Sequence, residues 1–112
     1  MTRLLWLLAL FATLLLAADL SGTWTFDVTT DAGSGTPTFH LKQDGEKLTG
    51  DYSGALGEAK VTGTVKGSDV VIQFGAQGES IVYKGTIQPD GTLKGTVQLG
   101  SAASGTFTGK KK

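Results

Sequence analysis

The sequence predicts an all-β domain: an antiparallel up-and-down meander of about eight strands that closes, or nearly closes, into a small barrel. Three observations lead to this prediction. Apolar and polar residues alternate in short runs between residues 19 and 112, with turn residues between the runs. No helical periodicity appears in this stretch, so no helix is expected there. All 17 glycines of the chain fall in the same stretch, and disordered glycine-rich linkers would not alternate so strictly.

Residues 1–18 are of a different kind. Arg3 is followed by an apolar run at residues 4–16, which is shorter than the roughly 20 residues needed to cross a bilayer. A positive residue, a short apolar segment and a small residue at its end, here Ala18, are typical of a secretory signal peptide. We therefore expect cleavage near Ala18, which would leave a secreted or periplasmic domain, residues 19–112, without a membrane span. The alternative is an uncleaved anchor, because Leu16 lies two residues before Ala18, at a position where signal peptides usually have a small residue.

Each predicted strand is a run of alternation bounded by turn residues. The first run contains Gly-Thr-Trp, and Asp44-Gly45, Gly67-Ser68 and Pro89 to Gly91 mark tight turns between later runs. In chain order the strands are expected near residues 21–28, 36–43, 47–53, 59–66, 69–75, 79–88, 92–98 and 103–109. Because the connections are short, neighbouring strands should pair as antiparallel hairpins, and closure would remove the exposed edges of the sheet.

Alternation also predicts which side chains form the interior, since successive residues of a strand point to opposite faces. The outer face collects Thr, Lys, Asp and Gln. The inner face is expected to hold Trp24, Phe26, Val28, Phe39, Leu41, Leu48, Tyr52, Val61, Val65, Val70, Ile72, Phe74, Ile81, Tyr83, Ile87, Leu93, Val97, Leu99 and Phe107.

A glycine recurs between two apolar residues in six related pentads, among them "VTGTV" and "LKGTV". Because these glycines share the apolar face, we expect them to point inward, where they let the sheet bend and make room in a narrow barrel. They are Gly22, Gly50, Gly63, Gly85, Gly95 and Gly105. The alternative is that they leave a cavity for a guest molecule.

Two segments resemble known families of small-molecule-binding barrels. "LSGTWTFDV" at residues 20–28 and "KLTGDYSGALGEAKVTG" at residues 47–63 are similar to the first half of the avidin and streptavidin family. Gly22 and Trp24 also resemble the G-x-W of lipocalins. Both resemblances imply a calycin-like barrel that binds a small molecule inside. The chain is also similar to uncharacterised small β-proteins exported by environmental bacteria.

The avidin resemblance transfers few site residues. Tyr52 matches the ligand-contacting tyrosine of that pattern. Gly54 stands where the family has a serine, and Phe26 stands where it has an asparagine. Once residues 1–18 are removed Trp24 is the only tryptophan, whereas avidins wall their ligand with several. The resemblance therefore implies the fold rather than biotin binding.

Composition and spacing argue against catalysis and against several partner classes. The 10 basic and 10 acidic residues balance, so no nucleic acid partner is expected. The chain has no cysteine, which excludes disulfides and thiolate chemistry. The single histidine, His40, is predicted on the outer face, and no metal-binding or catalytic-triad spacing occurs. We interpret the domain as a non-enzyme without a metal or cofactor.

Two binding interpretations remain. A small apolar ligand inside the barrel would lie against Trp24, Tyr52 and Tyr83, whose phenols could supply polar contacts, although these phenols could equally end in water at the rim. Alternatively, the protein is a structural or assembly subunit with a filled core. If "GAQG" closes a hairpin, Val71 and Val82 would lie opposite each other on the outer face and mark a homo-oligomer contact.

Overall fold

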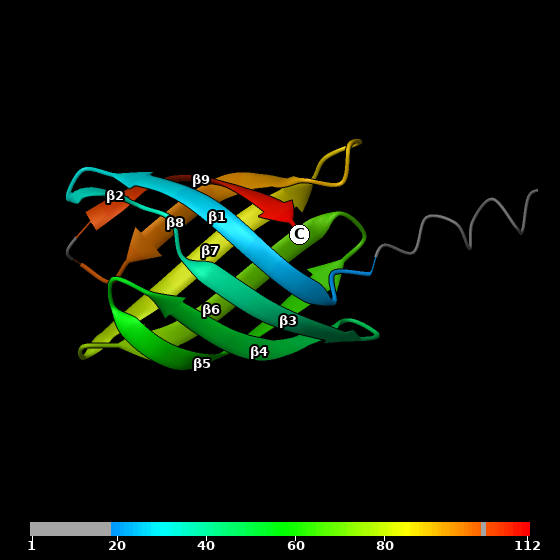
Figure 1. Cartoon of the computed structure of the whole chain (residues 1–112), viewed down its shortest axis with the longest axis horizontal. Coiled ribbons are helices and arrows are strands. Elements are labelled where there is room, and N and C mark those ends of the chain that lie inside the picture. Colours follow the sequence, from blue (N-terminus) through cyan, green and yellow to red (C-terminus); the bar gives the residue numbers. More distant parts are fainter. Residues whose placement is uncertain (1–18, 102) are drawn as a thin grey trace, which may run out of the picture.

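A computed structural model describes residues 19–101 and 103–112 of the chain, in which one antiparallel sheet wraps around on itself (Figure 1). The strands are β1 (Gly22–Thr30), β2 (Gly33–Gly35), β3 (Thr38–Asp44), β4 (Lys47–Gly54), β5 (Gly57–Lys66), β6 (Asp69–Ala76), β7 (Glu79–Ile87), β8 (Leu93–Leu99) and β9 (Ala103–Lys111). None of the described residues is helical, and no helix in them could span a membrane.

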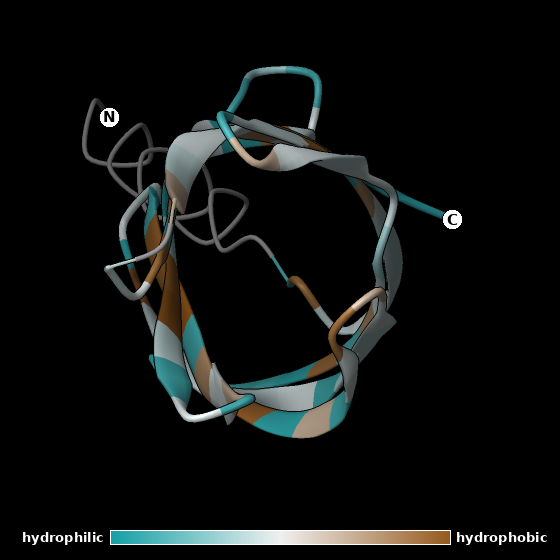
Figure 2. Cartoon of the chain, turned by 90° about the vertical axis from the view of Figure 1, so that its left-hand side faces the viewer, coloured by the Kyte–Doolittle hydropathy of each residue, from teal (hydrophilic) through white to brown (hydrophobic). Residues whose placement is uncertain are grey.

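The barrel closes because the first strand pairs with the last. β1 pairs with β3 from Gly22 to Thr25 and with β9 from Trp24 to Thr30, while each later strand pairs with its successor. Viewed along its length, the sheet forms a complete ring (Figure 2). The prediction of an all-β, closed antiparallel barrel is therefore confirmed.

The sequence analysis missed the short strand β2, which pairs only with the end of β1, from Val28↔Gly35 to Thr30↔Gly33. Its sequence, Gly-Ser-Gly, has no apolar residue and hence no alternation to detect. The backbone of Gly33 has a φ of 133°, a conformation that favours glycine. Eight long strands thus form the barrel wall, and β2 extends one of its ends.

The hairpin between β6 and β7 differs from the predicted register. Gln77 and Gly78 form the turn, with φ values of 53° and 80°. Positive φ at both central residues is typical of a type I′ turn. The pairing is therefore shifted by two residues: Val71 lies opposite Lys84, and Val82 lies opposite Gln73. The prediction that Val71 and Val82 lie directly opposite each other is wrong, and the two are diagonal neighbours on the outer face.

Apolar side chains fill the interior as the alternation predicts. Phe26, Phe39 and Leu93 have no exposed surface, and apart from the phenols of Tyr52 and Tyr83 and the indole of Trp24 no side chain with a polar group is buried among the described residues. The predicted inner side chains are buried except for Ile87 and Leu99, which are half-buried where β7 ends and β8 ends. The core comprises Leu20, Trp24, Phe26, Val28, Phe39, Leu41, Leu48, Tyr52, Val61, Val65, Val70, Ile72, Phe74, Ile81, Tyr83, Leu93, Val97, Ala103 and Phe107.

The strand glycines lie where neighbouring strands approach closely. A Cβ atom would collide with a backbone carbonyl of the next strand at four of them, Gly50, Gly63, Gly95 and Gly105, the carbonyls being those of His40, Val71, Lys84 and Thr29. At Gly85 a Cβ would meet the Lys94 carbonyl at 2.7 Å and the Phe107 ring at 2.9 Å. At Gly22 it would meet the Lys111 side chain. Except at Gly22, where the Lys111 side chain can move aside, a larger residue at these positions would have to push the strands apart.

Candidate functional site

One end of the barrel is covered by the chain that precedes β1. Leu20 is 2% exposed and lies in the core, where its carbonyl accepts a hydrogen bond from Trp24 Nε1 at 2.9 Å. The Leu20 N–H donates to Gln43 Oε1 at 2.8 Å, and Lys111 Nζ donates to the Asp19 carbonyl at 2.9 Å. We call this the closed end. In Figure 1 it lies on the right, where the blue segment begins.

The opposite end contains a cavity of about 500 Å³. We call it the mouth cavity. It lies between the β1–β2 hairpin, the segment that leads into β3, and the turn between β4 and β5; Figure 2 looks at the barrel from this end. The lining residues are Val28, Thr30, Ala32, Gly33, Ser34, Gly35, Thr36, Pro37, Tyr52, Gly54, Ala55, Leu56, Tyr83 and Leu99.

The mouth cavity lies where the hydrogen-bonded wall is interrupted. The pairing of β1 with β3 ends at Thr25↔Thr38, after which the Phe26 N–H donates to the Pro37 carbonyl at 3.0 Å. Proline has no N–H, so it cannot continue the ladder. Beyond this point β1 pairs with β2, which has no second strand partner among the described residues. The wall between β2 and the end of β4 therefore lacks strand pairing.

The β1–β2 hairpin on one side of the mouth cavity is held at its base. The Ala32 N–H donates to Thr30 Oγ1 at 3.1 Å, and this hydroxyl donates to the Gly33 carbonyl at 2.9 Å. The Asp31 N–H donates to the Ser104 carbonyl at 3.2 Å, and the Ser104 N–H donates to Asp31 Oδ1 at 3.1 Å. These bonds fix the hairpin to β9 while leaving its glycine-rich segment beside the cavity.

Tyr52 and Tyr83 line the inner part of the mouth cavity, and they are only 4% and 3% exposed. Phe74 stacks on both rings, with ring centres 4.4 Å and 6.3 Å away, and Phe39 packs edge-on against both at 5.4 Å. The Leu56 N–H donates to the Tyr52 hydroxyl at 3.4 Å. Neighbouring aromatic rings thus hold the two phenols in fixed orientations.

The Tyr83 hydroxyl faces the cavity. It forms no hydrogen bond to another described residue, yet no buried side-chain polar atom in the described part of the chain lacks a partner. Its oxygen must therefore be reachable from the cavity. Burial raises the pKa of Tyr83 well above its usual value, and the nearby Tyr52 adds to this effect. Like an ordinary tyrosine, Tyr83 is protonated at neutral pH and can donate a hydrogen bond.

The mouth cavity carries no formal charge. None of its lining residues is Asp, Glu, Lys, Arg or His. Its side-chain polar groups are the hydroxyls of Thr30, Ser34, Thr36 and the two tyrosines, and the remaining side-chain surface is apolar. Such a lining suits binding by shape and a few hydrogen bonds rather than by ion pairing.

The structure brings together two of the three predicted ligand-contacting residues. Tyr52 and Tyr83 share the mouth cavity, whereas Trp24 does not line it and instead packs at the closed end. Sequence reasoning missed the turn residue Leu56 and the segment 33–37. The available signal for Leu56 was that it is an apolar residue in a predicted turn, where polar residues are usual.

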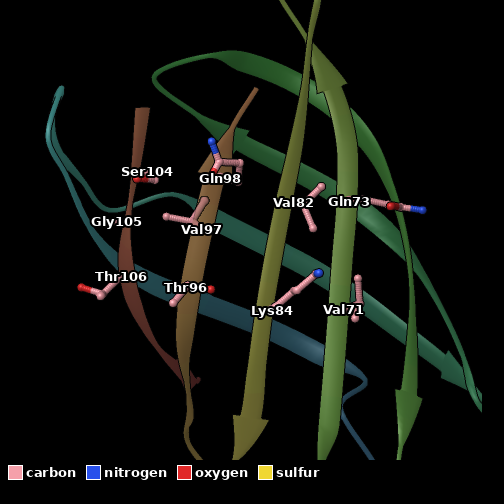
Figure 3. Close-up of a pocket in the computed structure, with 10 residues that line it drawn as sticks. All are labelled: Val71, Gln73, Val82, Lys84, Thr96, Val97, Gln98, Ser104, Gly105 and Thr106. Carbon is pink, nitrogen blue, oxygen red and sulfur yellow. The ribbon is translucent and has the colours of Figure 1, made fainter. Parts of the chain in front are cut away.

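The predicted outer-face contact residues lie in a separate hollow. Val71 and Val82 are half-buried and line a hollow of about 770 Å³ on the outer face of β6 to β9 (Figure 3). Besides these valines its lining is mainly Thr, Gln and Ser with Lys84, and it contains no aromatic residue. A homo-oligomer contact at this face stays a prediction.

His40 lies on the outer face, as expected from alternation, with its Nδ1 3.1 Å from Thr23 Oγ1. No carboxylate is hydrogen-bonded to it among the described residues. In residues 19–101 and 103–112 no group of three or more His, Asp or Glu side chains is placed to hold a metal ion. Nothing in this arrangement adds a second site to the mouth cavity.

Comparison with known proteins identifies a fold. No protein-family model matches the chain, and no curated protein sequence matches it. Among solved structures, an asparagine-to-alanine variant of the fluorescent protein UnaG is similar, with a TM-score of 0.50 and 18% identity over 83% of this chain and 96% of that one. An asparagine-to-glutamine variant gives a TM-score of 0.49 and 18% identity, covering 82% and 95%. The chain has a calycin-like barrel fold, while membership of an exported bacterial family stays a prediction.

Proposed function

We propose that this protein is an exported, non-enzymatic binding protein that takes a small, mostly apolar molecule into its mouth cavity. The observation that carries the proposal is the cavity itself: about 500 Å³ at one end of an otherwise filled barrel, with apolar walls and two oriented phenols. Ligand sites in proteins commonly have volumes of roughly 300–1,000 Å³ with mainly apolar linings and a few polar groups.

The mouth cavity is partly open to solvent, so water fills it when no ligand is bound. Its lining is more apolar than polar, and an apolar wall offers water few hydrogen bonds. A mostly apolar molecule that displaces this water removes apolar surface from solvent, which favours binding.

The lining also favours binding over catalysis. The cavity contains hydroxyl groups, but none of its residues could serve as a general base near neutral pH. Export is inferred from the signal-like residues 1–18, which lie outside the described part of the chain.

The proposal is tested by native mass spectrometry of the protein purified from its own secretion route, compared with its denatured intact mass. We expect the native mass to exceed the denatured mass by that of one small molecule. The denatured mass also tests export, because cleavage near Ala18 would shorten the chain accordingly. A native mass without any adduct would contradict ligand binding.

A matched pair of variants would locate the ligand. Gly35 lies in β2 with open space where its Cβ would be and lines the mouth cavity, so Gly35→Phe should place a ring in the cavity and abolish the adduct. Thr29 is exposed on the adjoining strand β1 and does not line the cavity. Thr29→Phe should therefore retain the adduct. Equal retention in both variants would show that the molecule binds elsewhere.

A further inference from the structure

Resting on the proposed function, we infer the chemical class of the ligand: an uncharged, compact molecule, largely apolar, that presents a hydrogen-bond acceptor such as a carbonyl oxygen to Tyr83. Three features of the mouth cavity lead to this inference. They are the absence of charged side chains among its described lining residues, the Tyr83 donor that has no partner in the described part of the chain, and the orientation of both phenols by their aromatic neighbours.

Neutrality follows from the lining. A carboxylate, sulfonate or ammonium group that enters the mouth cavity loses water contacts, and no side chain of opposite charge replaces them. Moving an unpaired ion out of water is unfavourable by far more than a few hydrogen bonds can return. The raised pKa of Tyr83 reports the same environment, because burial there opposes the charged form of the phenol itself.

The acceptor requirement follows from the hydrogen bonds of the two phenols. Tyr52 accepts the Leu56 N–H but its own O–H has no acceptor among the described residues, and the Tyr83 hydroxyl has neither a donor nor an acceptor partner among them. An apolar group placed against Tyr83 would deprive its hydroxyl of water and leave a donor unsatisfied. An acceptor atom placed there satisfies the donor, so an acceptor-bearing ligand is preferred over one of the same shape without an acceptor.

The donor position is also preorganised. Tyr83 packs edge-on against Phe26 at 5.5 Å and against Phe107 at 5.1 Å, in addition to its contacts with Phe39 and Phe74. A ring held on several sides loses little freedom when its hydroxyl forms a new bond. The cavity is thus able to distinguish ligands by the position of one acceptor atom.

Four probes of similar size test the inference. Prodan, which is 6-propionyl-2-(dimethylamino)naphthalene, is neutral and carries a ketone, while 6-propyl-2-(dimethylamino)naphthalene lacks the acceptor. The charged partners are 6-(dimethylamino)naphthalene-2-sulfonate and the trimethylammonium analogue of prodan. Prodan binding is followed by its fluorescence, and the other three probes are measured by displacement of prodan. We expect both charged probes to bind at least about ten-fold more weakly than prodan.

Variants separate the role of Tyr83 from that of the cavity as a whole. Tyr83→Phe should weaken prodan binding about five-fold, because the ketone loses its donor, and should strengthen binding of the propyl analogue, because no donor is then left unsatisfied. Thr29→Val removes an exposed hydroxyl from the outer face and should leave both affinities unchanged. Circular dichroism would check that both variants fold. If Tyr83→Phe does not fold, Tyr52→Phe gives a second comparison.

The outcomes distinguish the two levels of the argument. If neither neutral probe binds the unaltered protein, the proposed function itself is overturned. If prodan binds but the sulfonate or the ammonium probe binds as tightly, the cavity binds small molecules and the inference of a neutral ligand is wrong. If Tyr83→Phe weakens prodan and its propyl analogue equally, Tyr83 contributes shape alone and the acceptor requirement is wrong.

Discussion

The two ends of the barrel are built from the same eight long strands, yet they differ in what covers them. At the closed end, Leu20 enters the core and its backbone is hydrogen-bonded to Trp24 and Gln43. At the other end, the β1–β2 hairpin lies beside the opening, and Tyr52 and Tyr83 face a cavity of about 500 Å³. One end is closed by the packing of Leu20, and the other contains the mouth cavity.

This difference shows that the strand pattern and the access to the interior are set by different parts of the sequence. The alternating strands and their glycines build a wall common to both ends. Residues 19–20 and 31–35, which lie outside the predicted alternating strands, decide which end is open. Changes to the wall should therefore affect the whole fold, whereas changes at the ends should separate stability from binding.

The largest effect is expected from the wall. A Cβ at Gly63 would collide with the Val71 carbonyl, whereas Gly35 has no atom within 4 Å of the corresponding position and no positive φ. Gly63→Ala should lower the free energy of unfolding by about 3 kcal/mol, because adjacent strands would have to separate. Gly35→Ala should change it by less than about 0.5 kcal/mol. Urea denaturation followed by circular dichroism measures both, and equal stabilities would refute the close approach of β5 and β6.

A smaller effect should distinguish the ends. Leu20 is 2% exposed in the core, so Leu20→Ala should lower the free energy of unfolding by about 2–3 kcal/mol while leaving prodan affinity unchanged. Leu56 is half-buried and lines the mouth cavity, so Leu56→Ala should cost less than about 1 kcal/mol but weaken prodan binding. Thermal unfolding and prodan titration of both variants provide the measurement. The comparison fails if the two variants lose stability and affinity in the same proportion.

The sequence was sufficient to predict the barrel because its signal is local. Alternation alone identified most of the buried side chains of the eight long strands, including Phe26 and Leu93, which are fully enclosed, although it missed Ala103. It could not fix the β6–β7 register, since a shift of two residues leaves every side chain on the same face. The turn at Gln77-Gly78 decides that register through its positive φ values. A glutamine in that conformation was not a recognisable signal.

The mouth cavity was only partly predictable, because it depends on contacts between distant segments. Alternation placed Tyr52 and Tyr83 inside, but it could not show that both lie at the same end and Trp24 at the other. The gap in the wall arises where β1 changes its partner from β3 to β2, next to Pro37. Neither event leaves an apolar pattern in the sequence. The packing of Leu20 at the closed end was also not predicted, because Leu20 precedes the first predicted strand.

The last expected effect on stability comes from a change in pH rather than from a change in packing. Tyr83 has a folded-state pKa above its unfolded value of about 10, so its contribution to stability is complete below pH 10 and is lost as the pH rises further. At pH 11 the unfolded chain would carry the ionised phenol and the folded chain would not, which favours unfolding by about 1.4 kcal/mol relative to pH 8. The free energies of unfolding of the unaltered protein and of Tyr83→Phe are measured at both pH values. The change in the difference between them gives this quantity. The difference between the unaltered protein and Leu20→Ala should not change with pH, because no ionisable side chain is altered at the closed end. If the stability difference between the unaltered protein and Tyr83→Phe is also independent of pH, the phenol is already solvated in the folded protein. The mouth cavity is then a solvent-filled rim rather than a site that excludes charge.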